Sequence, residues 1–269
     1  MSITNLWNEV NVMNKIGIQL YSVRDHLTTE ESARETFKKL RELGYTEAQT
    51  AGCYGLDYGV FGKLANDAGI EIVGTHDPFE PMKNDLETCI ENHKKLGTTN
   101  MGIGGFGWGV TSSAVVEEFI ADANKIAKRL KEVGMKFTYH NHSQEFIKLD
   151  NGKTMMEMFM EGFDENITYV LDTYWVQNAG GDVCTWIEKL AGKIDILHLK
   201  DMAVKYAEDS SVVSYITEVG NGNIDFKKAI ETAEKCGVKY FCVEQDNCPF
   251  DFEPSLKASS DYLHKLCGF

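Results

Sequence analysis

The sequence lacks any long apolar stretch, and no run approaches the ~18 residues of a membrane-spanning helix. Its N-terminus, MSITNLWNEVNVMNK, contains no apolar core segment and no cleavage pattern, so we expect no secretory signal. Basic residues are few: 27 Lys and Arg stand against 41 Asp and Glu, giving a net charge of −14. Because nucleic acids and anionic bilayers both require a basic face, the charge balance excludes both as partners.

Paired cysteine spacing is also missing. The seven cysteines are an odd number and none forms a Cys-x-x-Cys motif. A disulfide framework or a four-cysteine zinc site would need such pairing, so we expect reduced thiols in a cytoplasmic protein. The cysteines are Cys53, Cys89, Cys184, Cys236, Cys242, Cys248 and Cys267.

One phrase recurs along the chain: an amphipathic helix, a glycine and then a short apolar run. It occurs in RELGYTEAQT, NDAGIEIVGTH, KKLGTTNMGIG, KEVGMKFTYH and EKCGVKYFCVE. Glycine directly after a helix is a left-handed cap, and the apolar runs are typical of buried strands. The pattern predicts strands at 16–20, 45–50, 70–75, 100–103, 135–140, 168–172, 194–199 and 239–244. It predicts helices near 29–43, 57–68, 84–96, 111–133, 153–162, 182–191, 225–236 and 254–266.

Alternating strands and helices indicate parallel strands with right-handed crossovers. Eight such units in 269 residues favour a closed (β/α)8 TIM barrel, with an open doubly wound sheet as the alternative. No Pro/Ser-rich linker or change in composition marks a second domain. We therefore expect a single-domain barrel over residues 15–269, preceded by an N-terminal extension at 1–14.

Polar residues collect where the predicted strands end, which is where a TIM barrel carries its active site. The relevant stretches are Gln19–Tyr21, His76–Asp77, Tyr139–Glu145, Asp172–Trp175, His198–Asp201 and Glu244–Asp246. Such a mixture of carboxylates and imidazoles suits one divalent cation: Mn²⁺, Mg²⁺, Co²⁺ or Zn²⁺. Asp172 and Asp201 have an alternative role as caps of the following turn. Glu244, which follows the buried run YFCV, requires a partner or a metal.

The remaining polar and aromatic residues divide into substrate contacts and surface groups. His26, His93 and His264 lie in a loop or on helices and are predicted to be at the surface, whereas His76 is either a core residue or a substrate contact. Aromatic rings near the same edge suit the C–H faces of a sugar, with plain packing as the alternative. The predicted substrate-binding residues are Gln19, Tyr21, His76, Trp108 and Trp175. The glycine-dense segment 102–109 permits close backbone approach but lacks a phosphate-loop motif.

These stretches resemble the xylose isomerase-like TIM barrel superfamily, in its sugar phosphate isomerase/epimerase branch. The resemblance is carried by GIQLYSVRD, YHNHSQEF, LDTYW, LHLKD, EVGNGNIDF and VEQD, and covers residues 15–269. It implies one divalent metal bound by Asp172, His198, Glu244 and a strand-5 residue. Epimerases have a Glu within that strand where this chain has His140, so the YHNHxxEF pattern implies Glu145 as the fourth ligand, with His142 or His140 as the alternative.

A metal at this position polarises a carbonyl and a neighbouring hydroxyl, and a base then forms an enediolate. We therefore expect a sugar (phosphate) isomerase or epimerase acting on a small ketose. The catalytic candidates are Glu145, Glu244, His140, His142 and Lys200, the last with a salt bridge to Asp201 or Glu218 as the alternative.

Two other functions remain open: a lyase or hydratase on keto-sugars, keto-inositols or 3-keto-glycosides, and a non-catalytic sugar-binding barrel. The endonuclease branch of the superfamily is excluded, because Trp175 replaces a required His and no His follows His198 before His264. Self-association into a homo-oligomer is left open.

Overall fold

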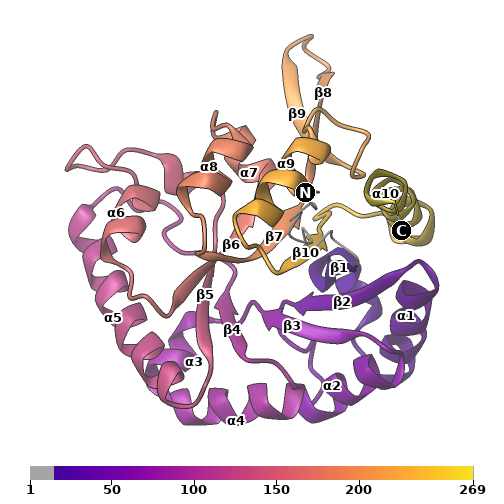
Figure 1. The fold of residues 1–269 in the computed structure, drawn as a ribbon, viewed down its shortest axis with the longest axis horizontal. Coiled ribbons are helices and arrows are strands. Elements are labelled where there is room, and N and C mark those ends of the chain that lie inside the picture. The colour runs from indigo at the N-terminus through magenta and orange to yellow at the C-terminus, as the bar shows by residue number, and fades with distance from the viewer. Residues whose placement is uncertain (1–14, 269) are drawn as a thin grey trace, which may run out of the picture.

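A parallel eight-stranded sheet forms the centre of the computed structural model, which describes residues 15–268 (Figure 1). The predicted extension at 1–14 lies outside these residues. The strands run β3-β2-β1-β10-β7-β6-β5-β4 around the sheet. They are β1 (Ile16–Gln19), β2 (Tyr45–Thr50), β3 (Glu71–Thr75), β4 (Asn100–Ile103), β5 (Lys136–His140), β6 (Ile167–Asp172), β7 (Ile194–Leu199) and β10 (Tyr240–Val243).

Helices surround the sheet and connect its strands (Figure 1). They are η1 (Leu20–His26), α1 (Glu30–Glu42), α2 (Tyr58–Asp67), α3 (Phe79–Asn84), α4 (Leu86–Leu96), α5 (Ser113–Glu132), η2 (Gln144–Phe146), α6 (Met155–Gly162), α7 (Thr173–Asn178), α8 (Val183–Lys189), α9 (Phe226–Lys235) and α10 (Glu253–Cys267). Every predicted strand and helix is present to within a few residues.

The sheet closes into a barrel at the seam between β3 and β4, its first and last strands, where hydrogen bonds between the strands are few. The Asn100 side-chain amide donates to the Val73 carbonyl at 2.8 Å, and the Asp77 N–H donates to the Gly102 carbonyl at 2.8 Å. A Cβ on Gly102 would lie 2.2 Å from the Thr138 hydroxyl and 2.5 Å from the Thr75 carbonyl, so only glycine fits there. The barrel prediction is thereby confirmed over the open-sheet alternative.

Alternation along the strands places an apolar layer beneath a polar one inside the barrel. Val73, Val170, Ile196 and Cys242 form a buried cluster of their own. Side chains two residues further along a strand point to the same face. Asp172, His198 and Glu244 therefore lie directly above Val170, Ile196 and Cys242, at the carboxyl end of the strands.

Five elements were not predicted: η1, η2, α3, α7 and a hairpin of β8 (Asp201–Tyr206) and β9 (Val212–Thr217). The hairpin projects from the barrel beyond β7 (Figure 1). The four helices are short, and the helical period is hard to recognise over so few residues.

The surface prediction for His93 is wrong. This residue lies on α4 and is 1% exposed. Its Nδ1 donates to the Cys89 carbonyl at 2.7 Å, and its Nε2 lies 2.9 Å from the Thr75 hydroxyl. The ring therefore packs against the sheet as a hydrogen-bonded core histidine. Over residues 15–268, we find no helix long and apolar enough to cross a membrane.

Candidate metal centre and pocket

Four buried side chains converge at the carboxyl ends of four neighbouring strands. They are His140 from β5, Asp172 from β6, His198 from β7 and Glu244, which follows β10. Each offers one ligand atom, and these atoms all lie within 4.8 Å of one another. The register explains the convergence, because Asp172 pairs with His198 across β6 and β7, and Cys242 pairs with His198 across β10 and β7.

The two carboxylate oxygens of Asp172 have different partners: one caps a helix and the other faces the cluster histidines. Its Oδ1 accepts from the Trp175 N–H at 2.9 Å and caps α7. Its Oδ2 lies 3.4 Å from His140 Nε2 and 3.6 Å from His198 Nδ1. The cap role and the cluster role that the sequence left as alternatives therefore coexist in one side chain.

The two imidazoles turn ring nitrogens toward these carboxylates. His140 Nδ1 lies 3.1 Å from the Gly104 carbonyl, which can only accept, so Nδ1 is a donor there, and Nε2, 3.4 Å from Asp172 Oδ2, is the nitrogen left to bind a cation. His198 Nδ1 lies 2.9 Å from Glu244 Oε2, yet makes no hydrogen bond to any residue within 15–268. An unsatisfied buried nitrogen between two carboxylates fits a divalent cation well.

Electrostatics keep both carboxylates ionised. Burial opposes ionisation, but the Lys200 ammonium and the neighbouring imidazoles lower the pKa of Asp172 to about 2 and that of Glu244 well below its usual range. Burial likewise opposes a charge on His198, but Glu244 and Asp172 raise its pKa to about 9. A proton and a metal ion thus compete for the same nitrogen.

Lys200 is held within the cluster rather than by the partners considered from the sequence. Its Nζ lies 3.1 Å from Glu244 Oε2 and 2.7 Å from Asp246 Oδ1, and the residue is 1% exposed. Burial would lower its pKa, but the surrounding carboxylates raise it above the usual range, so Lys200 stays an ammonium. Asp201 instead accepts from the N–H groups of Met202, Gly220, Gly222 and Ile224, and Glu218 accepts from Ser255.

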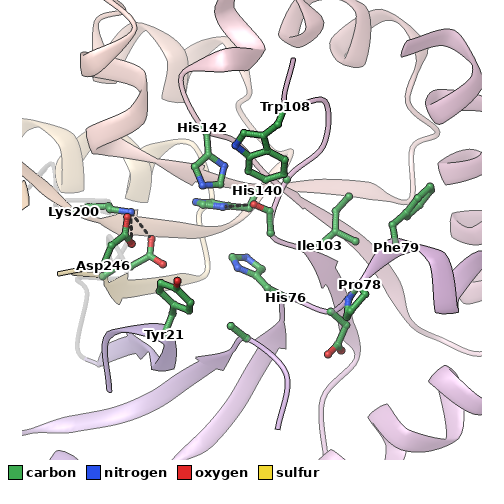
Figure 2. Close-up of a pocket in the computed structure, with 15 residues that line it drawn as sticks. Tyr21, His76, Pro78, Phe79, Ile103, Trp108, His140, His142, Lys200 and Asp246 are labelled. Carbon is green, nitrogen blue, oxygen red and sulfur yellow. Dashed lines mark hydrogen bonds and ion pairs between the residues drawn. The ribbon is translucent and has the colours of Figure 1, made fainter. Parts of the chain in front are cut away.

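A pocket of about 540 Å³ opens over the cluster (Figure 2). Its polar side is formed by His76, His140, His142, Lys200, Glu244 and Asp246, and its apolar side by Pro78, Phe79, Ile103 and Trp108. Tyr21 and Trp108 are exposed lining residues, at 41% and 64%. A volume of this size accommodates a sugar-sized molecule with room to spare.

Two uncharged histidines face this pocket. Burial and the neighbouring His140 lower the pKa of His142 to about 3, and burial with His140 and His198 lowers that of His76 well below its usual range. His142 lies between the rings of Trp108, at 5.2 Å, and Trp175, at 5.1 Å. Trp175 also lies 5.0 Å from Lys200 Nζ, so it packs against the site without being among the lining residues.

Besides Trp175, two predicted site residues are not brought into the pocket. Glu145 is fully buried, where it accepts from the Tyr139 hydroxyl at 2.7 Å and from the His142 N–H at 2.8 Å. His140, the alternative from the sequence, occupies the fourth position of the cluster instead. Gln19 is also fully buried and is not among the lining residues.

From the sequence, Asp246 was placed at a strand end without a role of its own, and Gln49 was not considered. Asp246 lines the pocket two residues after Glu244, on the same side of the chain, and this spacing in VEQD was the available signal. Gln49 is a fully buried amide in β2, and its Oε1 lies 2.5 Å from His198 Nε2. Four of the six residues of β2, YTEAQT, are polar, so nothing in the sequence distinguished Gln49.

The fold and the site together define a (β/α)8 barrel in which four potential ligands of a cation lie beneath a pocket large enough for a sugar. Comparison with known families makes this specific: the family model for the xylose isomerase-like TIM barrel matches residues 19–266. The chain belongs to this family. The superfamily resemblance drawn from the sequence is thereby confirmed.

Individual relatives are more distant. The chain is 27% identical over 138 residues to an inosose dehydratase of Clostridium perfringens, covering 47% of this chain and 46% of that protein. The chain thus spans about half the length of the curated relatives it matches. A sugar phosphate isomerase/epimerase structure from Parabacteroides distasonis aligns with a TM-score of 0.78 at 21% identity, covering 98% of both chains. An L-ribulose 3-epimerase structure aligns with a TM-score of 0.74 at 16% identity over 95% of both.

Proposed function

We propose that this protein is a metal-dependent enzyme that removes a proton next to a carbonyl group of a keto-sugar or keto-polyol. The observation that carries this proposal is the buried set of two imidazoles and two carboxylates beneath a sugar-sized pocket. This donor set suits a borderline divalent ion such as Zn²⁺, Co²⁺ or Mn²⁺. His140, Asp172, His198 and Glu244 would hold it, and a cation held there supplies Lewis-acid polarisation of a substrate carbonyl.

Two residues on the polar side of the pocket, His142 and Lys200, provide a neutral imidazole and an ammonium group. His142 is neutral at physiological pH because burial and the neighbouring His140 lower its pKa to about 3. Its imidazole therefore has a lone pair with which to take a proton from substrate, but at this pKa it is a weak base that requires an acidified carbon. Lys200 is a permanent ammonium and donates hydrogen bonds toward negative charge that develops on a substrate oxygen. Glu145 holds the loop that carries His142, through the backbone N–H of that residue.

Dehydration is the outcome that this arrangement favours. Loss of a β-hydroxyl as water requires that the proton taken from carbon be returned to the departing oxygen while the developing negative charge is stabilised. His142 would take and return the proton, and Lys200, which stays an ammonium, would donate a hydrogen bond to the charged oxygen. The similarity to inosose dehydratases supports the same outcome. Isomerisation or epimerisation is the second candidate, since both begin with the same proton abstraction and differ only in the carbon or face to which the proton returns.

Solvent exchange tests the shared first step. With inososes and ketoses as substrates in deuterated water, we expect metal-dependent incorporation of deuterium at carbon. His142→Gln should slow this incorporation about 10²- to 10⁴-fold without loss of bound metal. Mass spectrometry then separates the outcomes, because dehydration removes one water and isomerisation leaves the mass unchanged except for deuterium.

Two results would count against the proposal. Binding of these sugars without any exchange would exclude proton abstraction. Unchanged sugar affinity in Glu244→Gln, together with no turnover of any substrate, would instead support a non-catalytic sugar-binding barrel.

A further inference from the structure

The side-chain amide of Gln19 has an orientation that the backbone fixes. Gln19 ends β1 and precedes η1, and its Oε1 accepts from the Tyr21 N–H at 3.1 Å. A backbone N–H can only donate, so the oxygen of this amide must face Tyr21. The Nε2 group of Gln19 therefore points the other way, into the fully buried space beside β2 and β3.

Two neighbours receive the Nε2 hydrogens of Gln19. His76 Nδ1 lies at 3.3 Å and Gln49 Oε1 at 3.0 Å. Because an amide NH₂ can only donate, His76 Nδ1 must be an acceptor. The uncharged ring of His76 then carries its proton on Nε2, a buried atom without a hydrogen-bond partner among residues 15–268. His76 lines the pocket, stacked on His140 with ring centres 4.8 Å apart (Figure 2).

The orientation of the Gln19 amide determines that of the Gln49 amide, which in turn determines which nitrogen of His198 is protonated. Turning the Gln49 amide over would set its NH₂ against that of Gln19, so Oε1 must stay between Gln19 and His198. Gln49 Oε1 lies 2.5 Å from His198 Nε2 and therefore accepts the proton of that nitrogen. His198 Nδ1 is left facing Glu244 at 2.9 Å and Asp172 at 3.6 Å.

We propose that Gln19 and Gln49 form a relay, anchored on the Tyr21 N–H, that fixes the tautomers of two site histidines at once. His198 presents the Nδ1 lone pair to the metal, and His76 presents an Nε2–H donor to a substrate oxygen. Both glutamines are positioning residues, since neither is among the lining residues of the pocket. The His198 arm rests on the metal site proposed above, whereas the His76 arm does not.

Metal titration with shape-conserving variants tests the relay. We expect Gln49→Met to weaken Zn²⁺ or Cd²⁺ binding about 10- to 100-fold by calorimetry, as removal of a hydrogen bond to a ligating histidine does. Gln49→Glu should restore affinity, because a carboxylate oxygen also accepts from both Gln19 and His198. If Gln49 only fills space, Gln49→Met should instead bind the metal more tightly than Gln49→Glu. Asn166→Leu is the control, since this half-buried amide donates only to the Ala127 and Met135 carbonyls.

Nuclear magnetic resonance of isotope-labelled histidines in the wild-type protein reads the tautomers directly. In Cd²⁺-loaded protein we expect one-bond coupling of cadmium to Nδ1 of His198 and to Nε2 of His140. In the metal-free protein we expect His76 protonated on Nε2, and Gln19→Met should allow it to exchange with the other tautomer. His76→Gln and His198→Gln assign the signals.

The outcomes separate the relay from the metal site. Wild-type protein that binds neither Zn²⁺ nor Cd²⁺ overturns the metal site and the His198 arm, while the His76 measurement still decides the other arm. Normal wild-type affinity that Gln49→Met leaves unchanged overturns the relay alone. Cadmium coupling to Nε2 of His198, or a His76 proton on Nδ1, also overturns it.

Discussion

Asp172 illustrates how much one side chain does at this site. One carboxylate oxygen caps α7 and the other faces both cluster histidines. From the sequence these two roles were competing explanations, and the sequence had no means of assigning separate oxygens to them. The same limit applied to the fourth cluster position, where His140 lies and Glu145 was expected.

Substitutions at Asp172 separate the two roles. Asp172→Asn keeps an acceptor for the Trp175 N–H but removes the charge, so bound metal should fall while the metal-free barrel stays folded. Asp172→Ala should lose metal and a further ~1 kcal/mol of stability from the missing cap. Elemental analysis and thermal melts followed by circular dichroism measure the two effects.

A matched control for these variants is Asp182→Ala. Asp182 caps α8 by accepting from the Thr185 N–H at 2.7 Å and is not among the four cluster residues. It should lose a similar stability and keep its full metal content. Full metal occupancy in both Asp172 variants would show that the ligand assignment is wrong.

At the scale of elements, the sequence predicted the repeating units well and the irregular ones poorly. Helix-ending glycines and apolar runs located every strand of the barrel, because each is a local signal. The β8–β9 hairpin was not assigned, although MAVKY and VVSYI are rich in residues that favour strands. The burial of His93 was also not predicted, because it depends on how α4 packs against β3.

Gly102 gives a prediction at this scale. Gly102→Ala should destabilise the protein by about 1–3 kcal/mol, because the added methyl overlaps Thr138 and Thr75 at the seam of the barrel. Gly104→Ala is the control two residues along, where the nearest atoms of His76 lie at 3.6 Å, an ordinary contact. Denaturant unfolding compares the two, and equal stabilities would contradict tight closure at this seam.

At the scale of the whole molecule, the cation cluster ties together strands that are distant in the sequence. Residues 140 and 244 share the cluster, so an ion bound there should stabilise the entire barrel. At a hundred times its dissociation constant, Zn²⁺ or Co²⁺ should add about 2.7 kcal/mol to the free energy of unfolding. This corresponds to a rise in Tm of roughly 5 °C or more for a domain of this size.

Scanning calorimetry with and without a chelator measures that rise. His198→Ala should show no metal-dependent change in Tm and should retain little metal. If the variant is stabilised as much as the wild-type protein, the ion binds elsewhere.

The four cluster residues and several residues that line the pocket come from different parts of the chain. All four cluster residues follow residue 139, whereas Tyr21, His76, Pro78, Phe79, Ile103 and Trp108 all precede residue 109. The candidate ion ligands and one wall of the pocket therefore come from separate halves of the chain. Recombination that exchanges the first half between relatives would alter which molecule fits while keeping all four cluster residues, and ion binding would be preserved where the incoming half also carries the glutamines that orient His198.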